Sequence, residues 1–117
     1  MSIYNKRKLG AAKEETACIF LKNKGYEIIE RNYSYKHGEI DIIARKGDIL
    51  VFVEVKYRSS IMYGMPYEAV DYKKQQRIIN ASKYYMLTHG ISDTIIRYDV
   101  ISILQDEITH YKDAFWT

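Results

Sequence analysis

The sequence predicts an α/β fold in which two helices flank a mixed β-sheet, with the element order α-β-β-β-α-β-β. Two segments carry apolar residues at helical spacing, and runs rich in β-branched and aromatic residues lie between and after them. A short connection containing Gly47 joins two of these runs in the manner of a β-hairpin. Because every element must bury one face, we expect the helices to cover the sheet.

The first half of the chain predicts one helix and three strands. The helix is expected over residues 5–24, because apolar or small residues recur every three or four positions and Gly25 suits the end of a helix. Its expected buried stripe consists of Leu9, Ala12, Thr16, Ile19 and Phe20. Strands are expected over residues 26–35, 39–45 and 49–57, the last two forming the hairpin.

The second half predicts a loop, a helix and a returning pair of strands. Residues 59–66 hold the only proline together with Gly64, which is typical of a loop. A helix is expected over residues 67–89, followed by Gly90, with one stripe made of Val70, Lys74, Ile78, Ala81 and Tyr85. Residues 94–104 are expected to form a strand onto which residues 108–112 pair back.

Composition restricts the class of protein. The chain has 117 residues, of which 47% are hydrophobic and 28% charged, which excludes disordered, collagen-like and coiled-coil proteins and predicts one domain over residues 1–117. A single cysteine, Cys18, cannot form an intramolecular disulfide, and we expect it to be packed rather than nucleophilic. No apolar run approaches the roughly 20 residues of a membrane span. We therefore expect a cytoplasmic protein without membrane attachment.

Charge is unevenly distributed along the chain. Residues 1–83 hold 16 of the 18 Lys and Arg but only 10 of the 15 Asp and Glu, so the remaining segment is acidic. Such a distribution suits a surface that meets a polyanion, and it equally suits an ordinary solvated surface. The 12 tyrosines leave a similar choice between packing and stacking on nucleic acid.

The hairpin carries an unusual group of charged residues. Strict alternation places Glu39 and Asp41 on one face of the first strand and Glu54 and Lys56 on one face of the second, while the opposite face is aliphatic. A two-residue turn at residues 46–47 would put Asp41 opposite Phe52 and diagonally beside Glu54. An odd register would bury the carboxylates among valines, so we expect the even one.

Neighbouring carboxylates require neutralisation by a basic partner or a divalent cation. Lys56 supplies part of that charge, and the oxygen ligands of Asp41 and Glu54 suit Mg²⁺ or Mn²⁺. The alternative is a salt-bridged, solvated face in which Glu54 pairs with Lys56, and Glu39 pairs with Arg31 or Lys36. Spacing alone leaves both readings open.

These residues resemble a known pattern. The segment Gly38-Glu39-Ile40-Asp41, followed after 12 intervening residues by Glu54-Val55-Lys56, resembles the PD-(D/E)xK nuclease signature, with Ile40 in place of the proline. Over residues 8–102 the chain also resembles the YraN-type family of small bacterial proteins, which is grouped with Holliday-junction-resolvase-like nucleases. Further matching residues are Glu14, Ala17, Leu21, Lys24-Gly25-Tyr26, Arg31-Asn32-Tyr33, Lys74, Ala81 and Arg97-Tyr98-Asp99-Val100.

This resemblance implies a restriction-endonuclease-like fold and a metal-dependent active site. Asp41 and Glu54 would bind Mg²⁺ or Mn²⁺, with the carbonyl of Val55 as a third ligand, and Lys56 would orient or help to deprotonate the attacking water. Glu14 resembles the helix-one glutamate that joins the site in resolvase-like relatives, although an exposed helical carboxylate is an equal alternative. Glu39 lies next to the site as a further catalytic candidate.

The implied function is hydrolysis of DNA phosphodiester bonds, in branched or single-stranded DNA. Phosphate contacts are expected from Arg58, Lys73, Lys74 and Arg77, and a symmetric junction substrate would require a homodimer. One alternative is a nucleic-acid-binding module of the same fold without significant catalysis. Another is a structural or partner-binding domain whose charged face is solvated.

Overall fold

A computed structural model describes residues 3–58 and 70–116 of the chain and confirms the expected order α-β-β-β-α-β-β. The predicted loop at residues 59–66 and residues 67–69 of the predicted second helix lie outside the described residues, whereas Val70 and Asp71 are described and precede that helix. The elements are α1 (Ile3–Asn23), β1 (Glu27–Tyr35), β2 (Gly38–Lys46), β3 (Ile49–Arg58), α2 (Tyr72–Thr88), β4 (Ile95–Leu104) and β5 (Glu107–Phe115).

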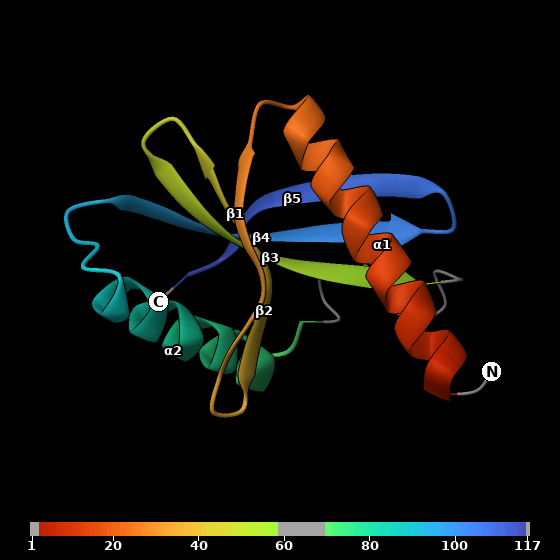
Figure 1. Cartoon of the computed structure of the whole chain (residues 1–117), viewed down its shortest axis with the longest axis horizontal. Coiled ribbons are helices and arrows are strands. Elements are labelled where there is room, and N and C mark those ends of the chain that lie inside the picture. The colour runs from red at the N-terminus through yellow and green to blue at the C-terminus, as the bar shows by residue number, and fades with distance from the viewer. Residues whose placement is uncertain (1–2, 59–69, 117) are drawn as a thin grey trace.

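The five strands form one mixed sheet in the spatial order β1-β2-β3-β4-β5. Strand β3 pairs with β4 in parallel, because α2 carries the chain back across the sheet between them, and the remaining pairs are antiparallel. Figure 1 shows α1 crossing in front of the strands and α2 lying along the opposite side of the sheet. This architecture is consistent with the restriction-endonuclease-like fold.

Each helix buries a different face of the sheet. Under α2, the residues Ile78, Ala81 and Tyr85 pack with side chains of all five strands, as the expected stripe of this helix predicts. Under α1, a second cluster forms around Leu21 and Cys18. The thiol of Cys18 is buried and forms no disulfide. The cores therefore lie on both sides of the central strands.

The predicted buried stripe of α1 is wrong at Ala12, Thr16 and Ile19, which are exposed, whereas Phe20 packs against the core under this helix. The residues that the helix buries fully are Ala17, Cys18 and Leu21, whereas Ile19 is 50% exposed. Two of the three are small, so the helix backbone approaches the sheet closely along a face that has little apolar bulk. Helical spacing alone therefore selected a face that only partly meets the sheet.

The hairpin register also differs from the expected one. Lys46 pairs with Ile49, so the turn is formed by Gly47 and Asp48, not by residues 46–47. Gly47 has a φ of 58°, a conformation that a tight hairpin turn favours and that glycine adopts without strain. The shift preserves the parity of the two strands, and the same register continued by one residue brings Asp41 opposite Glu54.

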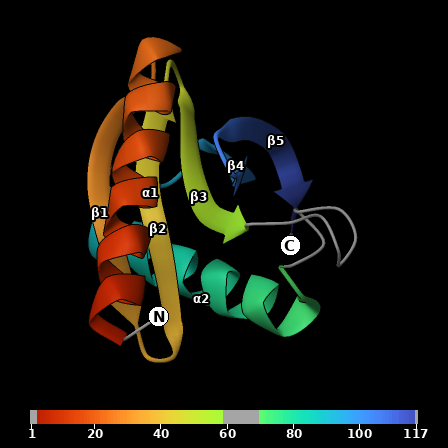
Figure 2. The same cartoon turned by 90° about the vertical axis from the view of Figure 1, so that its right-hand side faces the viewer.

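The alternation of β2 breaks at Asp41. Ile42 packs under α1, but Ile40 packs under α2 with Ile43, although residues 40 and 42 would share a face in a regular strand. The predicted aliphatic face therefore does not include Ile40. The described pairing of β2 with β3 ends at Ile42 and Val53, and from there β2 follows β1 while β3 follows β4. Figure 2 shows β3 bending away from the β1–β2 hairpin.

The helix α2 has defined caps at both ends. The Asp71 carboxylate accepts a hydrogen bond of 2.8 Å from the backbone N–H of Lys74, which is the N-cap arrangement that starts a helix. At the other end His89 caps the helix and Gly90 follows with a φ of 62°.

Within the described part of the chain, neither α1 nor α2 has the length and hydropathy of a membrane-spanning helix.

Candidate functional site

The candidate site lies where β2 and β3 separate. Asp41 is 9% exposed, and its Oδ2 atom accepts a hydrogen bond of 2.8 Å from the backbone N–H of Val55. Glu54, the residue before Val55, is 4% exposed. The separation of the strands opens the space in which these two carboxylates meet, and the Val55 bond ties the strands together across it.

Glu54 is held in an unfavourable state for a carboxylate. Its Oε2 atom lies 3.3 Å from Nζ of Lys74, yet this buried oxygen has no hydrogen-bond partner among the described residues. Burial, followed by the hydrogen bond and the charge of Asp41, raises the pKa of Glu54 to about 8, against the opposing effects of Lys74 and Lys56. In the metal-free protein Glu54 therefore keeps its proton at neutral pH, and only its ionised form needs further positive charge beside it.

Two lysines, Lys56 and Lys74, lie close enough to this carboxylate pair to interact with its charge. Lys56 is half-buried on β3, and burial together with the charge of Lys74 lowers its pKa. Burial also disfavours the charged form of Lys74, but Glu54 and Asp41 outweigh that effect and raise the pKa of Lys74. Lys56 is thus the more readily deprotonated of the two amines, which suits a group that exchanges protons. The ion pair that the salt-bridge alternative assigned to Lys56 is made by Lys74.

Glu14 of α1 faces the same region from the other layer. Its side chain is 18% exposed and lies 4.0 Å from Arg31, measured from Oε1 to Nη2. The amide of Asn32, with its nitrogen turned toward Glu14, donates to Oε1 at 2.9 Å. Burial and then the charge of Asp41 raise the pKa of Glu14, while Arg31 and Asn32 oppose the rise. Glu14 is therefore not a fully solvated helical carboxylate, and the negative charge of Asp41 disfavours its ionised form.

Glu39 occupies a different environment. Its side chain is exposed and lines a hollow of about 270 Å³ with Glu54, Lys74, Arg77 and His37. Among residues 3–58 and 70–116, no group of three or more His, Cys, Asp and Glu side chains has the geometry to hold a metal ion. A cation at this site would thus take two carboxylates, a backbone carbonyl and water, a donor set that suits Mg²⁺.

The four basic residues expected at phosphates fall into separate positions. Arg77 is exposed and lines the 270 Å³ hollow, and Lys73 is exposed at the start of α2. Lys74 turns instead toward Glu54. Arg58 ends β3, where its carbonyl accepts a hydrogen bond from the backbone N–H of Gln105. The structure therefore groups Lys74 and Arg77 beside the carboxylates.

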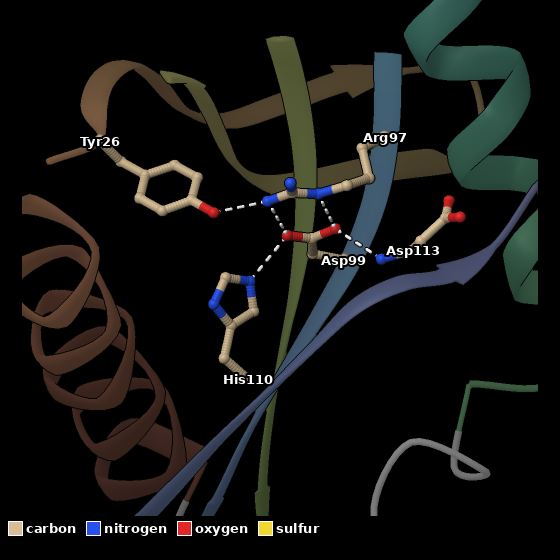
Figure 3. A network of polar contacts seen from close by, with 5 residues as sticks. All are labelled: Tyr26, Arg97, Asp99, His110 and Asp113. Carbon is tan, nitrogen blue, oxygen red and sulfur yellow. Dashed lines mark hydrogen bonds and ion pairs between the residues drawn. The ribbon is translucent and has the colours of Figure 1, made fainter. Parts of the chain in front are cut away.

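A buried polar network that the sequence did not predict surrounds Asp99 (Figure 3). Asp99 is fully buried, and Arg97 from the same strand binds both its oxygens, through Nε and Nη2, at 2.8 Å each. His110 Nε2 lies 2.7 Å from Oδ2, and the backbone N–H of Asp113 donates to Oδ1 at 2.9 Å. Arg97 also donates to the hydroxyl of Tyr26.

This network stabilises the junction of β4, β5 and the segment before β1. Burial disfavours the Asp99 carboxylate, but the hydrogen bonds from His110, Arg97 and Asp113 outweigh burial and lower the pKa of Asp99. The ring of His110 packs edge-on against Tyr26 and Phe20 beneath α1. A sequence signal existed, because Arg97 and Asp99 share a face of an otherwise apolar strand.

The fold and the site together define an α/β protein with a five-stranded mixed sheet whose central strands part at two buried carboxylates flanked by lysines. Residues 13–103 match the family described as "Uncharacterised protein family UPF0102". The chain belongs to this family, which confirms the YraN-type resemblance.

Relatives from several bacteria match over almost their whole length. A UPF0102 protein from Alkaliphilus oremlandii is 48% identical over 115 residues, covering 93% of this chain and 98% of the relative. One from Lachnoclostridium phytofermentans is 46% identical over 112 residues, or 95% of each chain. A third, from Clostridioides difficile, is 43% identical over 113 residues, covering 95% of this chain and 99% of the relative.

Proposed function

We propose that this protein is a metal-dependent endonuclease that hydrolyses DNA phosphodiester bonds. The observation that carries the proposal is the meeting of two buried carboxylates, Asp41 and Glu54, beside Lys56 where β2 and β3 separate. Burial of two adjacent carboxylates destabilises a fold unless their negative charge is neutralised. A bound divalent cation would neutralise both at once.

Asp41, Glu54 and the Val55 carbonyl would hold Mg²⁺ or Mn²⁺. The buried Oε2 atom of Glu54, which lacks a hydrogen-bond partner among the described residues, supports this fit because a cation would satisfy it. When bound, a divalent cation supplies polarisation of the phosphodiester and a lower pKa for a bound water. The hydrogen bond from Val55 to Asp41 holds that carboxylate in place beforehand.

Lys56 is the residue that would handle the proton of the attacking water. Its pKa is lowered by burial and by Lys74, so its neutral form is more accessible than that of an exposed lysine. Glu14 on α1 and Glu39 at the start of β2 add negative charge near Asp41. Arg58, Lys73 and Arg77 would bind the DNA backbone, so affinity should fall as salt rises, whereas Lys74 is paired with Glu54 beside that path.

The decisive experiment is a cleavage assay on labelled single-stranded, duplex and four-way-junction DNA with Mg²⁺, Mn²⁺ or EDTA. We expect cleavage that requires the cation, that is lost in Asp41→Asn and Glu54→Gln, and that falls at least about 100-fold in Lys56→Ala with little change in DNA affinity. Lys112→Ala, at an exposed position of β5, is the matched lysine control. Equal cleavage by wild type and Asp41→Asn would reveal a contaminating nuclease and refute the proposal.

The second candidate function is DNA binding without catalysis. It is favoured by one observation, that no third acidic side chain joins Asp41 and Glu54 in metal-holding geometry among the described residues. This function predicts salt-dependent DNA binding that persists in EDTA and in Lys56→Ala, with no cleavage of any of the three substrates. The same assay therefore separates the two candidates.

A further inference from the structure

A second, larger hollow lies between α2 and the turn that joins β1 to β2. Its volume is about 460 Å³, and its lining includes the rings of Tyr35 and Tyr84, the apolar side chain of Leu87, and cationic side chains. Leu87 is 77% exposed and Tyr84 is 40% exposed. The hollow thus combines an apolar, aromatic surface with charge, which is typical of a binding site rather than of a packing defect.

The charge in this hollow has one sign. Lys36, Arg77 and Lys83 contribute cationic side chains, and the described residues that line the hollow include no carboxylate. Lys36, Arg77 and Lys83 are all exposed, so their charges are available to a ligand. An anionic ligand is therefore favoured at this position.

The aromatic part of the hollow is a preformed stack. The rings of Tyr35 and Tyr84 lie parallel within 15°, with centroids 4.0 Å apart, and Lys36 Nζ lies 5.4 Å from the centroid of Tyr35. The stack joins the end of β1 to α2, so the two rings hold each other in orientation. A planar, electron-rich ligand such as a nucleobase can extend a stack of this kind.

The hollow adjoins the candidate active site. Arg77 and His37 line both this hollow and the 270 Å³ hollow that contains Glu54 and Lys74. A ligand with several phosphates in a row could therefore occupy the carboxylate site and the tyrosine hollow at once, with Arg77 between them. A DNA strand has this form.

We propose that the tyrosine hollow binds an unpaired nucleotide of single-stranded DNA, whose base stacks on Tyr84 while Arg77 and Lys83 bind the adjacent phosphates. A base in a duplex has both faces covered by its neighbours, so only an unpaired base can use the stack. The inference rests on the proposed function for its substrate class and refines it to DNA with unpaired nucleotides near the cleaved bond. Binding at the hollow does not itself require cleavage.

The test measures fluorescence anisotropy of a labelled oligonucleotide of about 15 nucleotides, single-stranded or annealed to its complement, in EDTA. We expect wild type to bind the single strand more tightly than the duplex. Tyr84→Ala should weaken single-strand binding about tenfold, the loss expected for one stacked base, and leave duplex binding unchanged. Tyr84→Phe keeps the ring and should bind as wild type does.

Tyr72→Ala is the matched control, because Tyr72 is 74% exposed on the same helix and does not line the hollow. Equal affinity of wild type for single strand and duplex, or equal losses in Tyr84→Ala and Tyr72→Ala, would overturn the inference. Cleavage in Mg²⁺ is scored separately. Tyr84-dependent single-strand binding without cleavage would overturn only the proposed function, and cleavage without Tyr84 dependence would overturn only the tyrosine hollow.

Discussion

The backbone N–H of Val55 donates a 2.8 Å hydrogen bond to the Asp41 carboxylate across the point at which β2 and β3 cease to pair. A side chain thereby replaces the backbone ladder for one residue. The bond orients Asp41 toward β3, so that Glu54 and Lys56 stand beside it although the strands diverge. The strand separation that makes room for a ligand is therefore compatible with a defined position of both carboxylates.

Replacement of Glu54 by glutamine should stabilise the metal-free protein at alkaline pH. Because the folded-state pKa of Glu54 is raised to about 8 from 4.5, the folded protein holds a proton between these values that the unfolded chain has lost. The contribution of Glu54 to the free energy of unfolding is fully present below pH 4.5 and is lost as the pH rises through about 8. A glutamine at position 54 does not ionise, so the Glu54→Gln variant does not lose this stability at alkaline pH.

We expect a gain of about 2 kcal/mol or more at about pH 8.5 and little gain at about pH 5, since one pKa unit corresponds to about 1.4 kcal/mol. Urea unfolding in EDTA at both pH values measures it. Glu27→Gln, an exposed change on β1, should alter neither value. A gain that is independent of pH would show that the pKa of Glu54 is not raised in the folded protein.

Divalent cations should stabilise the wild type and not Asp41→Asn. Mn²⁺ binding requires the ionised carboxylates, so the rise in Tm on adding Mn²⁺ should grow as the pH increases toward about 8.5. For a chain of this size, each kcal/mol of stabilisation by the bound ion should raise Tm by about 4 °C. Differential scanning fluorimetry gives the shift. Asp48→Asn, in the exposed hairpin turn, should keep the wild-type response. A comparable Mn²⁺ shift in Asp41→Asn would place the metal elsewhere.

Lys74 and its neighbour Lys73 should differ in their effect on stability. Lys74 lies 3.3 Å from a buried carboxylate oxygen of Glu54, whereas Lys73 is exposed. At about pH 9, where Glu54 is ionised, Lys74→Ala should lower the free energy of unfolding by about 1 kcal/mol or more, and Lys73→Ala by much less. Chemical denaturation of both variants provides the comparison. Equal losses would mean that the Glu54 ion pair contributes nothing.

Gly38 should tolerate no side chain. A Cβ atom there would collide with the backbone carbonyl oxygen of Arg77 and would lie 3.3 Å from Cβ of Ala81, so α2 would have to move off the sheet. We expect Gly38→Ala to cost about 2 kcal/mol of stability, typical of overpacking. Gly10→Ala is the opposite case, because it meets open space within a helix and should stabilise by about 0.5–1 kcal/mol. Thermal unfolding of both variants checks the contrast.

The Asp99 network should be essential for stability rather than for catalysis. Asp99→Asn leaves Arg97 without its buried partner and should cost about 3–5 kcal/mol at neutral pH. Because hydrogen bonds hold the folded-state pKa of Asp99 below 3.8, its contribution is present above that pH and is lost as pH falls through the lowered value. The difference from wild type should therefore shrink in acid. Asp106→Asn, in the exposed turn between β4 and β5, is the control.

Local patterns in the sequence were sufficient for the order of the elements and for most of their boundaries. Period-two alternation and the turn glycine predicted β2 and β3, and helical spacing with Gly90 predicted α2, because these signals depend on neighbouring residues only. The YraN-type resemblance was confirmed by the family match over residues 13–103. The nuclease roles of Asp41, Glu54 and Lys56 remain predictions.

Tertiary structure decided which residues meet. The hairpin turn lies at residues 47–48 instead of 46–47, because Gly47 adopts the positive φ that a tight turn favours. Strand β2 breaks its alternation at Asp41, where β2 stays paired with β1 and β3 stays paired with β4. Lys74, not Lys56, pairs with Glu54, because α2 approaches the sheet at Gly38. The tyrosine hollow joins residues 35 and 84, which no local pattern connects.

Local sequence patterns were thus enough to predict the helices and strands, the family and the charged residues of the hairpin. The burial of Asp41 and Glu54 together, the approach of a lysine from α2, and the burial of Asp99 beside Arg97 and His110 could not be predicted from those patterns. The physical reason is that burial and pairing depend on how distant segments pack against each other. The pKa of a buried charged group therefore depends on burial and on partners from distant segments as well as on its neighbours along the chain.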